Sequence, residues 1–136
     1  MVKTAPYILF VDDDADDREL LQLCCEELFI AAKVQFVTGG EALFDFLRTL
    51  AEPERYPSLL VLDVNMPGVD GEEALLRLKR DPRYRSIPVV MLSTASQRPD
   101  YFTYIGADAF YTKPNQYLSL KRLVAALYER LTSPRF

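Results

Sequence analysis

The run Tyr7-Ile8-Leu9-Phe10-Val11 is apolar throughout, and three acidic residues, Asp12-Asp13-Asp14, follow it directly. The run is β-prone and lacks the polar–apolar alternation of a half-exposed strand, so it predicts a strand buried on both faces. The next segment, Ala15 to Ile30, is predicted to be a helix. Its apolar residues recur at helical spacing, namely Leu20, Leu21, Cys24, Leu28 and Phe29.

The same unit of strand and helix is predicted four more times along the chain. The further strands are Val34–Val37, Leu59–Leu62, Val89–Leu92 and Ala109–Tyr111. The further helices are Glu41–Leu50, Glu72–Arg80, Pro99–Ile105 and Tyr117–Leu131. Because strands without alternation are each followed by a helix, the pattern predicts a doubly wound α/β fold of (βα)5 type. Its parallel sheet would be covered on both faces, with right-handed crossovers.

Length and composition narrow the possible functions. The chain has 136 residues, which fits one domain, and we expect residues 1–136 to form it around a core at about 7–131. The net charge of −4 argues against a general nucleic-acid-binding surface. Histidine is absent, which excludes Ser-His-Asp and Cys-His catalysis and imidazole metal sites. Any reaction must use carboxylates, lysine, hydroxyls or cysteine.

No feature of the sequence directs the chain to a membrane or an oxidising compartment. No apolar run approaches the roughly 18 residues of a membrane span, and Met1–Pro6 lacks the pattern of a cleaved signal. Cys24 and Cys25 are adjacent and cannot form an unstrained disulfide, so we expect reduced thiols, one of them facing the core. These observations predict a cytoplasmic protein.

Polar residues follow four of the predicted strands at their carboxyl ends, where ligands bind in doubly wound sheets. They are Asp12 and Asp13, Asp63, Ser93, and Lys113. If the first and third strands are neighbours, the three carboxylates converge, and their repulsion requires a raised pKa or a cation. An incomplete set of oxygen ligands favours Mg²⁺.

A carboxylate beside Mg²⁺ is able to attack phosphorus and become an acyl phosphate. Lys113 would add a second cation to the phosphoryl group, and Ser93 a hydroxyl donor. The neighbouring acidic residues have a simpler interpretation. We expect Asp14 to cap the first helix, and Asp16 and Asp17 to complement its dipole.

These residues, in this order, resemble the receiver domain of two-component response regulators. The resemblance covers Tyr7 to about Leu131 and implies a flavodoxin-like fold with strand order 2-1-3-4-5. The stretches that carry it are Ile8-Leu9-Phe10-Val11-Asp12-Asp13-Asp14, Leu62-Asp63-Val64-Asn65-Met66-Pro67-Gly68-Val69-Asp70-Gly71, Pro88-Val89-Val90-Met91-Leu92-Ser93 and Gly106-Ala107-Asp108-Ala109-Phe110-Tyr111-Thr112-Lys113-Pro114.

The resemblance implies a role for each acidic residue of the cluster. Asp63 would accept the phosphoryl group and, with Asp13, ligate Mg²⁺ directly. Asp12 would act mostly through a metal-bound water, and the backbone carbonyl of Asn65 would complete the protein ligands. Self-phosphorylation and self-dephosphorylation would be weak at most, so the protein is not expected to be an enzyme.

The resemblance also implies a switch. Ser93 would hydrogen-bond the phosphoryl group, Lys113 would pair with it, and the Lys113–Pro114 peptide would be cis. Phe110 stands where the family places its switch aromatic, commonly Tyr, and would turn inward as Ser93 moves. The alternative is a permanently buried core residue. Thr94 stands where a small residue is usual, which leaves the phosphoryl lifetime open.

Two connecting segments, Ala51–Pro57 and Arg80–Pro88, resemble those of stand-alone regulators that serve phytochrome-like or hybrid sensor kinases. The expected partners are such a histidine kinase and either a histidine phosphotransfer protein or a downstream target. A homodimer through the last helix and fifth strand is open. No output domain, nucleic acid or membrane contact is expected. We interpret Arg80, Arg83 and Arg85 as a solvated loop rather than a docking patch.

Two other functions compete with this interpretation. A haloacid-dehalogenase-type phosphohydrolase would use Asp12 as nucleophile and Asp14 as general acid. Asp16 then stands where that family usually has Thr or Val. A degenerate receiver would be a constitutive docking module that binds its partner equally well without phosphorylation.

Overall fold

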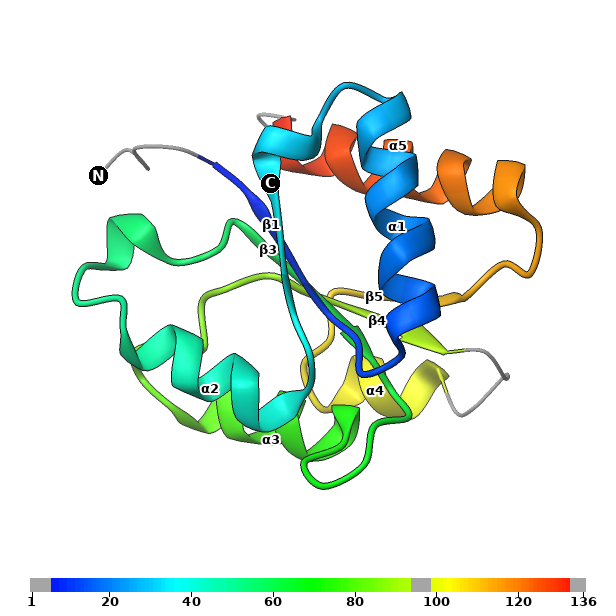
Figure 1. The fold of residues 1–136 in the computed structure, drawn as a ribbon. Coiled ribbons are helices and arrows are strands. Elements are labelled where there is room, and N and C mark those ends of the chain that lie inside the picture. Colours follow the sequence, from blue (N-terminus) through cyan, green and yellow to red (C-terminus); the bar gives the residue numbers. More distant parts are fainter. Residues whose placement is uncertain (1–5, 94–98, 133–136) are drawn as a thin grey trace.

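Five parallel strands form one sheet in the order β2-β1-β3-β4-β5, as predicted (Figure 1). This is a computed structural model, and it describes residues 6–93 and 99–132. Adjacent strands are in register, with Val11 beside Leu62 in the central pair and Asp63 beside Leu92 in the next. The strands are β1 Ile8–Val11, β2 Val34–Val37, β3 Leu59–Asp63, β4 Val89–Ser93 and β5 Ala109–Thr112.

Helices cover both faces of this sheet, and Figure 1 shows α1 and α5 on one side and α2, α3 and α4 on the other. The helices are α1 Ala15–Glu27, α2 Gly40–Arg48, α3 Gly71–Arg80, α4 Pro99–Tyr104 and α5 Tyr117–Thr132, with short 3-10 turns η1 Ala31–Lys33 and η2 Pro53–Arg55. Within the described ranges, none of the helices is both long and apolar enough to cross a membrane.

Alternate side chains of each strand enter different hydrophobic cores. In β1, Ile8 and Phe10 pack with residues of α1 and α5, whereas Leu9 and Val11 pack with residues of α2, α3 and α4. Every residue of β1 is therefore buried, which explains why the run lacks alternation. The sheet is packed on both faces, and the residues that follow its strands lie together at its carboxyl edge.

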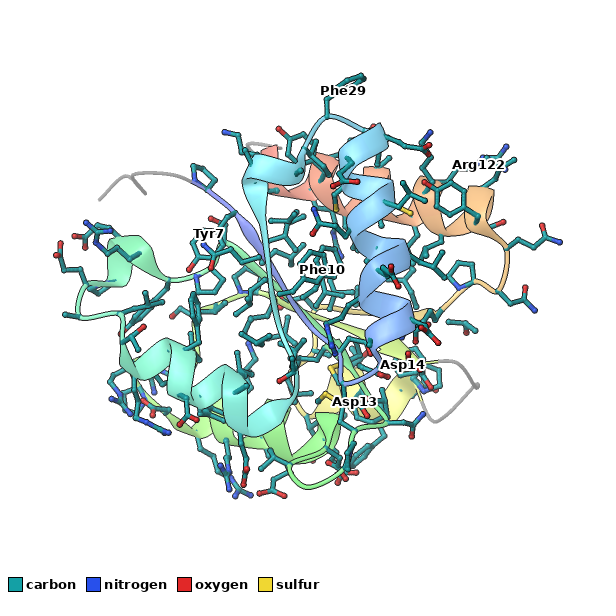
Figure 2. All side chains as sticks on the ribbon, in the orientation of Figure 1. Tyr7, Phe10, Asp13, Asp14, Phe29 and Arg122 are labelled. Atoms are coloured by element: carbon teal, nitrogen blue, oxygen red, sulfur yellow. The ribbon has the colours of Figure 1, made fainter. Side chains whose placement is uncertain are left out.

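The end of α1 departs from the prediction. The helix stops at Glu27, because the amides of Phe29 and Ile30 bond back to the carbonyls of Glu26 and Cys25 at 3.1 and 2.9 Å in a Schellman turn. Phe29 has a φ of 61° and is 95% exposed, and it projects away from the fold in Figure 2. Its predicted place in the buried stripe is wrong.

Leu20 was also expected in that stripe but is 43% exposed. Both cysteines are fully buried, whereas only one of them was expected to face the core. The remaining elements begin and end within one or two residues of the predicted positions.

Candidate functional site

Three carboxylates from two neighbouring strands meet at the carboxyl edge of the sheet. Asp12 and Asp13 follow β1, and Asp63 is the last residue of β3. One oxygen from each lies within 4.8 Å of the others. The expected convergence is therefore present, and it follows directly from the pairing of β1 with β3.

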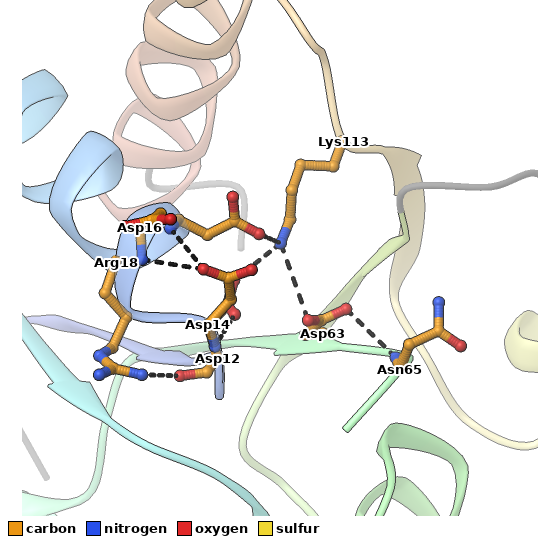
Figure 3. A network of polar contacts seen from close by, with 8 residues as sticks. Asp12, Asp14, Asp16, Arg18, Asp63, Asn65 and Lys113 are labelled. Atoms are coloured by element: carbon orange, nitrogen blue, oxygen red, sulfur yellow. Dashed lines mark hydrogen bonds and ion pairs between the residues drawn. The ribbon is translucent and has the colours of Figure 1, made fainter. Parts of the chain in front are cut away.

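Lys113, just after β5, brings its ammonium group into this cluster (Figure 3). Its Nζ lies 2.7 Å from Asp12 Oδ2, 3.0 Å from Asp17 Oδ2 and 3.7 Å from Asp63 Oδ2. The Lys113 side chain is 6% exposed, so its charge needs these partners to remain inside the protein. The ion pairs with Asp12 and Asp63 join β5 to the central strands.

Burial sets the protonation of the site. It raises the pKa of Asp63 to about 6, the Lys113 ammonium opposes that rise, and Asp12 and Asp13 add to it. Burial alone would lower the pKa of Lys113, but Asp12, Asp63 and Asp17 together hold it above its ordinary value. One cation thus serves several carboxylates, and the cluster has an excess of negative charge.

This donor set fits a hard divalent cation. All three side chains offer only oxygen, and Asp13 is exposed, which leaves room for water to complete the coordination. A cation there would supply the charge compensation that Lys113 gives only in part. Asp12, Asp13 and Asp63 are the residues that would hold it.

Backbone amides orient two of the carboxylates. The amide of Asn65 donates to Asp63 Oδ1 at 3.2 Å, and the amide of Asp14 donates to Asp12 Oδ1 at 3.0 Å. The carboxylate of Asp14 caps α1, as predicted, by accepting from the amides of Asp16 and Asp17. Asp14 is thus committed to the helix start.

Gly71 lets α3 begin directly against the backbone of Asp63. A Cβ at this position would lie 2.5 Å from the Asp63 carbonyl oxygen and 2.7 Å from Val64 Cα. The amide of Gly71 donates to the Val64 carbonyl at 3.0 Å, which closes the loop between β3 and α3. The need for glycine at position 71 arises from contact with the backbone of Asp63 and Val64, so the sequence pattern alone does not predict it.

The predicted switch residues, Ser93 and Phe110, lie on the neighbouring strands β4 and β5. Ser93 ends β4 and is fully buried, and its carbonyl accepts from the amide of Lys113 at 2.6 Å. Phe110 in β5 is half-buried, with its ring centroid 5.5 Å from that of Phe102 in α4. Thr94 lies outside the described residues.

The predicted cis peptide is wrong. No peptide bond is cis within residues 6–93 and 99–132, so Lys113–Pro114 is trans. A bond before proline favours trans by only about 0.5–1 kcal/mol, so either isomer is accessible. With the trans bond Lys113 Nζ hydrogen-bonds Asp12 and Asp17.

Asp17 is a member of the site that the sequence reasoning assigned only to the helix dipole. Its carboxylate leaves the first turn of α1 and bonds Lys113 Nζ at 3.0 Å. The available signal was its position in the first turn after a strand end, which faces the same edge of the sheet.

The arginines considered as a docking patch lie elsewhere. Arg80, Arg83 and Arg85 are all exposed, and Arg83 pairs with Asp81 at 2.9 Å. Arg80 and Arg83, with Arg48 and Arg77, line an open hollow of about 450 Å³. Their interpretation as a solvated loop stays a prediction.

Residues 8–127 match the family model of the response regulator receiver domain. The chain belongs to this family. Receiver domains belong to two-component signalling systems, in which an aspartate is phosphorylated by a histidine kinase, and they bind divalent metal ions. They are signalling proteins rather than classical enzymes. The phosphohydrolase alternative is therefore not favoured.

Relatives of known sequence span most of this receiver domain. The probable methanogenesis regulatory protein FilR2 of Methanothrix harundinacea is 32% identical, over 90% of this chain and 81% of that protein. Response regulator Rcp1 of Synechocystis is 30% identical, over 88% of this chain and 84% of Rcp1.

Solved receiver structures agree with the fold. The phosphorylated cyanobacterial phytochrome response regulator RcpA superposes with a TM-score of 0.81 at 30% identity, covering 96% of each chain. The Mn²⁺-bound form of Rcp1 gives 0.77 at 29% identity, covering 94% of this chain and 96% of Rcp1. The predicted likeness to phytochrome-type receivers is confirmed.

Proposed function

We propose that Asp63 is the phosphoryl acceptor of this receiver domain and that Mg²⁺ assists the transfer. The observation that carries the proposal is the gathering of three carboxylates within 4.8 Å, with the Lys113 ammonium 3.7 Å from Asp63. This arrangement places a nucleophile, a metal-binding oxygen set and a fixed cation at one edge of the sheet.

The contacts favour Asp63 over its neighbours as nucleophile. Both oxygens of Asp12 accept hydrogen bonds, from Lys113 Nζ at 2.7 Å and from the amide of Asp14 at 3.0 Å. Asp63 Oδ1 accepts from the amide of Asn65, whereas Oδ2 is 3.7 Å from Lys113, beyond hydrogen-bond distance. Among the described residues, Asp63 Oδ2 therefore accepts no hydrogen bond, and the bond from Asn65 to Oδ1 orients the side chain.

Asp13 and Asp63 would bind Mg²⁺ directly, with the Asn65 carbonyl, and Asp12 would act through a water. The bound ion would neutralise charge on the transferring phosphoryl oxygens. Asp63 would form a new bond to phosphorus as the bond between phosphorus and the donor histidine breaks. Lys113 would pair with the transferred group, and Ser93 would donate its hydroxyl to it.

The proposed output is a change of protein contacts. Ser93 and Phe110 would shift after phosphorylation, and Phe102 in α4 lies within ring contact of Phe110. The partners proposed are a phytochrome-like or hybrid histidine kinase and a phosphotransfer or target protein, with a homodimer through α5 and β5 as a further form. The likeness to Rcp1 supports a single receiver domain over residues 1–136.

Phosphorylation by a small acyl phosphate tests the proposal. Purified protein is incubated with acetyl phosphate, with and without Mg²⁺, and its intact mass is recorded. We expect one added phosphoryl group that requires Mg²⁺ and is absent from Asp63→Asn. An adduct of equal yield in that variant would contradict the assignment of Asp63, and a partner that binds equally well without phosphorylation would favour the docking module.

A further inference from the structure

Asp17 adds to the site a fourth carboxylate, which is not one of the three clustered carboxylates Asp12, Asp13 and Asp63. Its Oδ2 lies 3.0 Å from Lys113 Nζ, closer than the 3.7 Å from that nitrogen to Asp63 Oδ2. The Asp17 side chain is 29% exposed, so this ion pair is partly shielded from water. Lys113 is therefore held from the α1 side by two carboxylates at once.

The number of N–H donors on Lys113 indicates what the contact with Asp17 does. An ammonium group has three N–H donors in a fixed tetrahedral arrangement. Asp12 and Asp17 accept two of them, at 2.7 and 3.0 Å. Asp63 Oδ2 lies 3.7 Å from Nζ, beyond hydrogen-bond distance, so Asp63 does not accept the third donor.

We infer that Asp17 is a positioning residue for Lys113. By occupying one donor, Asp17 fixes the rotation of the ammonium group and keeps another donor directed at the place where a phosphoryl oxygen bound to Asp63 would lie. The inference rests on the proposed function, because it concerns how Lys113 is presented to the acceptor.

The first turn of α1 is built to hold Asp17 in this place. Asp14 Oδ1 accepts from the amides of Asp16 and Asp17 at 2.8 and 3.2 Å. Arg18 Nη1 donates to the Asp12 carbonyl at 2.8 Å. These bonds join the start of the helix to the loop that carries Asp12, and so hold the two carboxylates that contact Lys113 in place relative to each other.

Helix-dipole stabilisation does not account for Asp17. Asp16 is in the same turn and has the same charge, so it gives the same favourable interaction with the dipole. Asp16 is exposed, and no ion pair joins it to any other residue of the described ranges. The contact with Lys113 is what distinguishes Asp17, and Asp16 is its matched control.

Removal of Asp17 frees Lys113 to approach Asp63. The ammonium group would then close the 3.7 Å gap and cover the free oxygen of the acceptor. For Asp17→Ala we expect the rate of phosphorylation at saturating Mg²⁺ to fall by about five- to tenfold, the effect of one partly exposed charge-assisted hydrogen bond. Asp17→Glu keeps the charge and restores most of the rate.

The experiment compares wild type, Asp17→Ala, Asp17→Glu and Asp16→Ala with acetyl phosphate as donor. The measured quantities are the phosphorylation rate at saturating Mg²⁺, the Mg²⁺ dissociation constant by calorimetry, and the thermal unfolding midpoint. We expect Asp17→Ala to slow the reaction while its Mg²⁺ affinity changes less than about twofold and its midpoint matches that of Asp16→Ala. A purely structural role would not separate the rate from these two properties.

Three results would overturn the inference. The first is a phosphorylation rate of Asp17→Ala equal to that of wild type. The second is an equal loss of rate in Asp16→Ala. The third is a loss of rate in Asp17→Ala that is fully explained by weaker Mg²⁺ binding. Wild-type protein serves as the reference for the proposed function itself. If it takes up no phosphoryl group, the proposed function fails, whereas normal uptake with no effect at Asp17 refutes the positioning role alone.

Discussion

Lys113 Nζ donates a 2.7 Å hydrogen bond to Asp12 Oδ2, across 101 positions of the sequence. The two side chains are only 6% and 3% exposed. A buried ion pair of this kind contributes little net stability, but loss of one partner leaves the other as an uncompensated buried charge. Lys113 therefore contributes both to the stability of the fold and to the candidate site.

Substitution of Lys113 by Ala should destabilise the metal-free protein by about 3 kcal/mol, because Asp12 and Asp63 lose their shared cation. Urea unfolding measures the change. Lys121→Ala is the control, since Lys121 pairs with Glu27 at 3.4 Å, both side chains are partly exposed, and the loss should cost less than about 1 kcal/mol. Equal losses of stability in the two variants would show that the buried ion pair contributes no more to stability than the partly exposed one.

Asp63 should make the metal-free protein less stable as the pH rises. Its pKa is raised from 3.8 to about 6, so between these values the folded protein holds a proton that the unfolded chain has released. Stability is therefore lost as pH increases through this range, by up to about 3 kcal/mol. Asp63→Asn removes this dependence, and the variant should be more stable than wild type at neutral pH by about 2 kcal/mol.

Unfolding of both proteins without metal, from pH about 4 to neutral, measures the difference. Saturating Mg²⁺ should reverse the order, because a ligand at one hundred times its dissociation constant adds about 2.7 kcal/mol to the protein that binds it. Parallel stability curves for wild type and Asp63→Asn across this pH range would refute the raised pKa.

Gly71→Ala should destabilise the protein by more than about 2 kcal/mol. The new Cβ would lie 2.5 Å from the Asp63 carbonyl oxygen, a backbone atom that is unable to rotate away. Gly39→Ala is the matched control, because no atom other than those of Gly39 and its chain neighbours lies within 4 Å of its Cβ position, and it should cost less than about 1 kcal/mol. Thermal unfolding compares the two, and a small effect at Gly71 would mean that α3 shifts freely against β3.

Phe29→Gly should be more stable than Phe29→Ala by about 1 kcal/mol, because a φ of 61° is unfavourable for any residue with a Cβ. The ring is 95% exposed, so both variants lose almost no buried surface. Urea unfolding of the pair isolates the backbone effect. If the alanine variant equals or exceeds the glycine variant, the left-handed conformation carries no cost here.

The sequence predicted the features that depend on the composition of a single strand and on the residues that directly follow it. The buried run before Asp12 and the run ending at Asp63 predicted the parallel sheet. The meeting of their carboxylates was predicted only if the two strands are neighbours, a strand order that the resemblance implied and the structure shows. Because β5 belongs to the same sheet, Lys113 also follows a strand at this edge.

The failures concern features that depend on other elements. The rotation of α1 about its axis is set by packing on α5 and the sheet, so Leu20 faces outward although its spacing suits a buried stripe. Phe29 faces outward because it lies beyond the last residue of α1, in the Schellman turn. The bond from Asp17 to Lys113 joins positions 96 residues apart, and helix-start statistics explain an acidic residue there equally well. The trans bond before Pro114 likewise has no local signature.

The most direct measurement is the identity of the phosphorylated residue. Protein treated with acetyl phosphate and Mg²⁺ is reduced with borohydride, which converts an aspartyl phosphate to homoserine, and its peptides are sequenced by mass spectrometry. The account predicts the modification at Asp63 alone, with none in Asp63→Asn. Modification at Asp12, or no acyl phosphate on any residue, would contradict it.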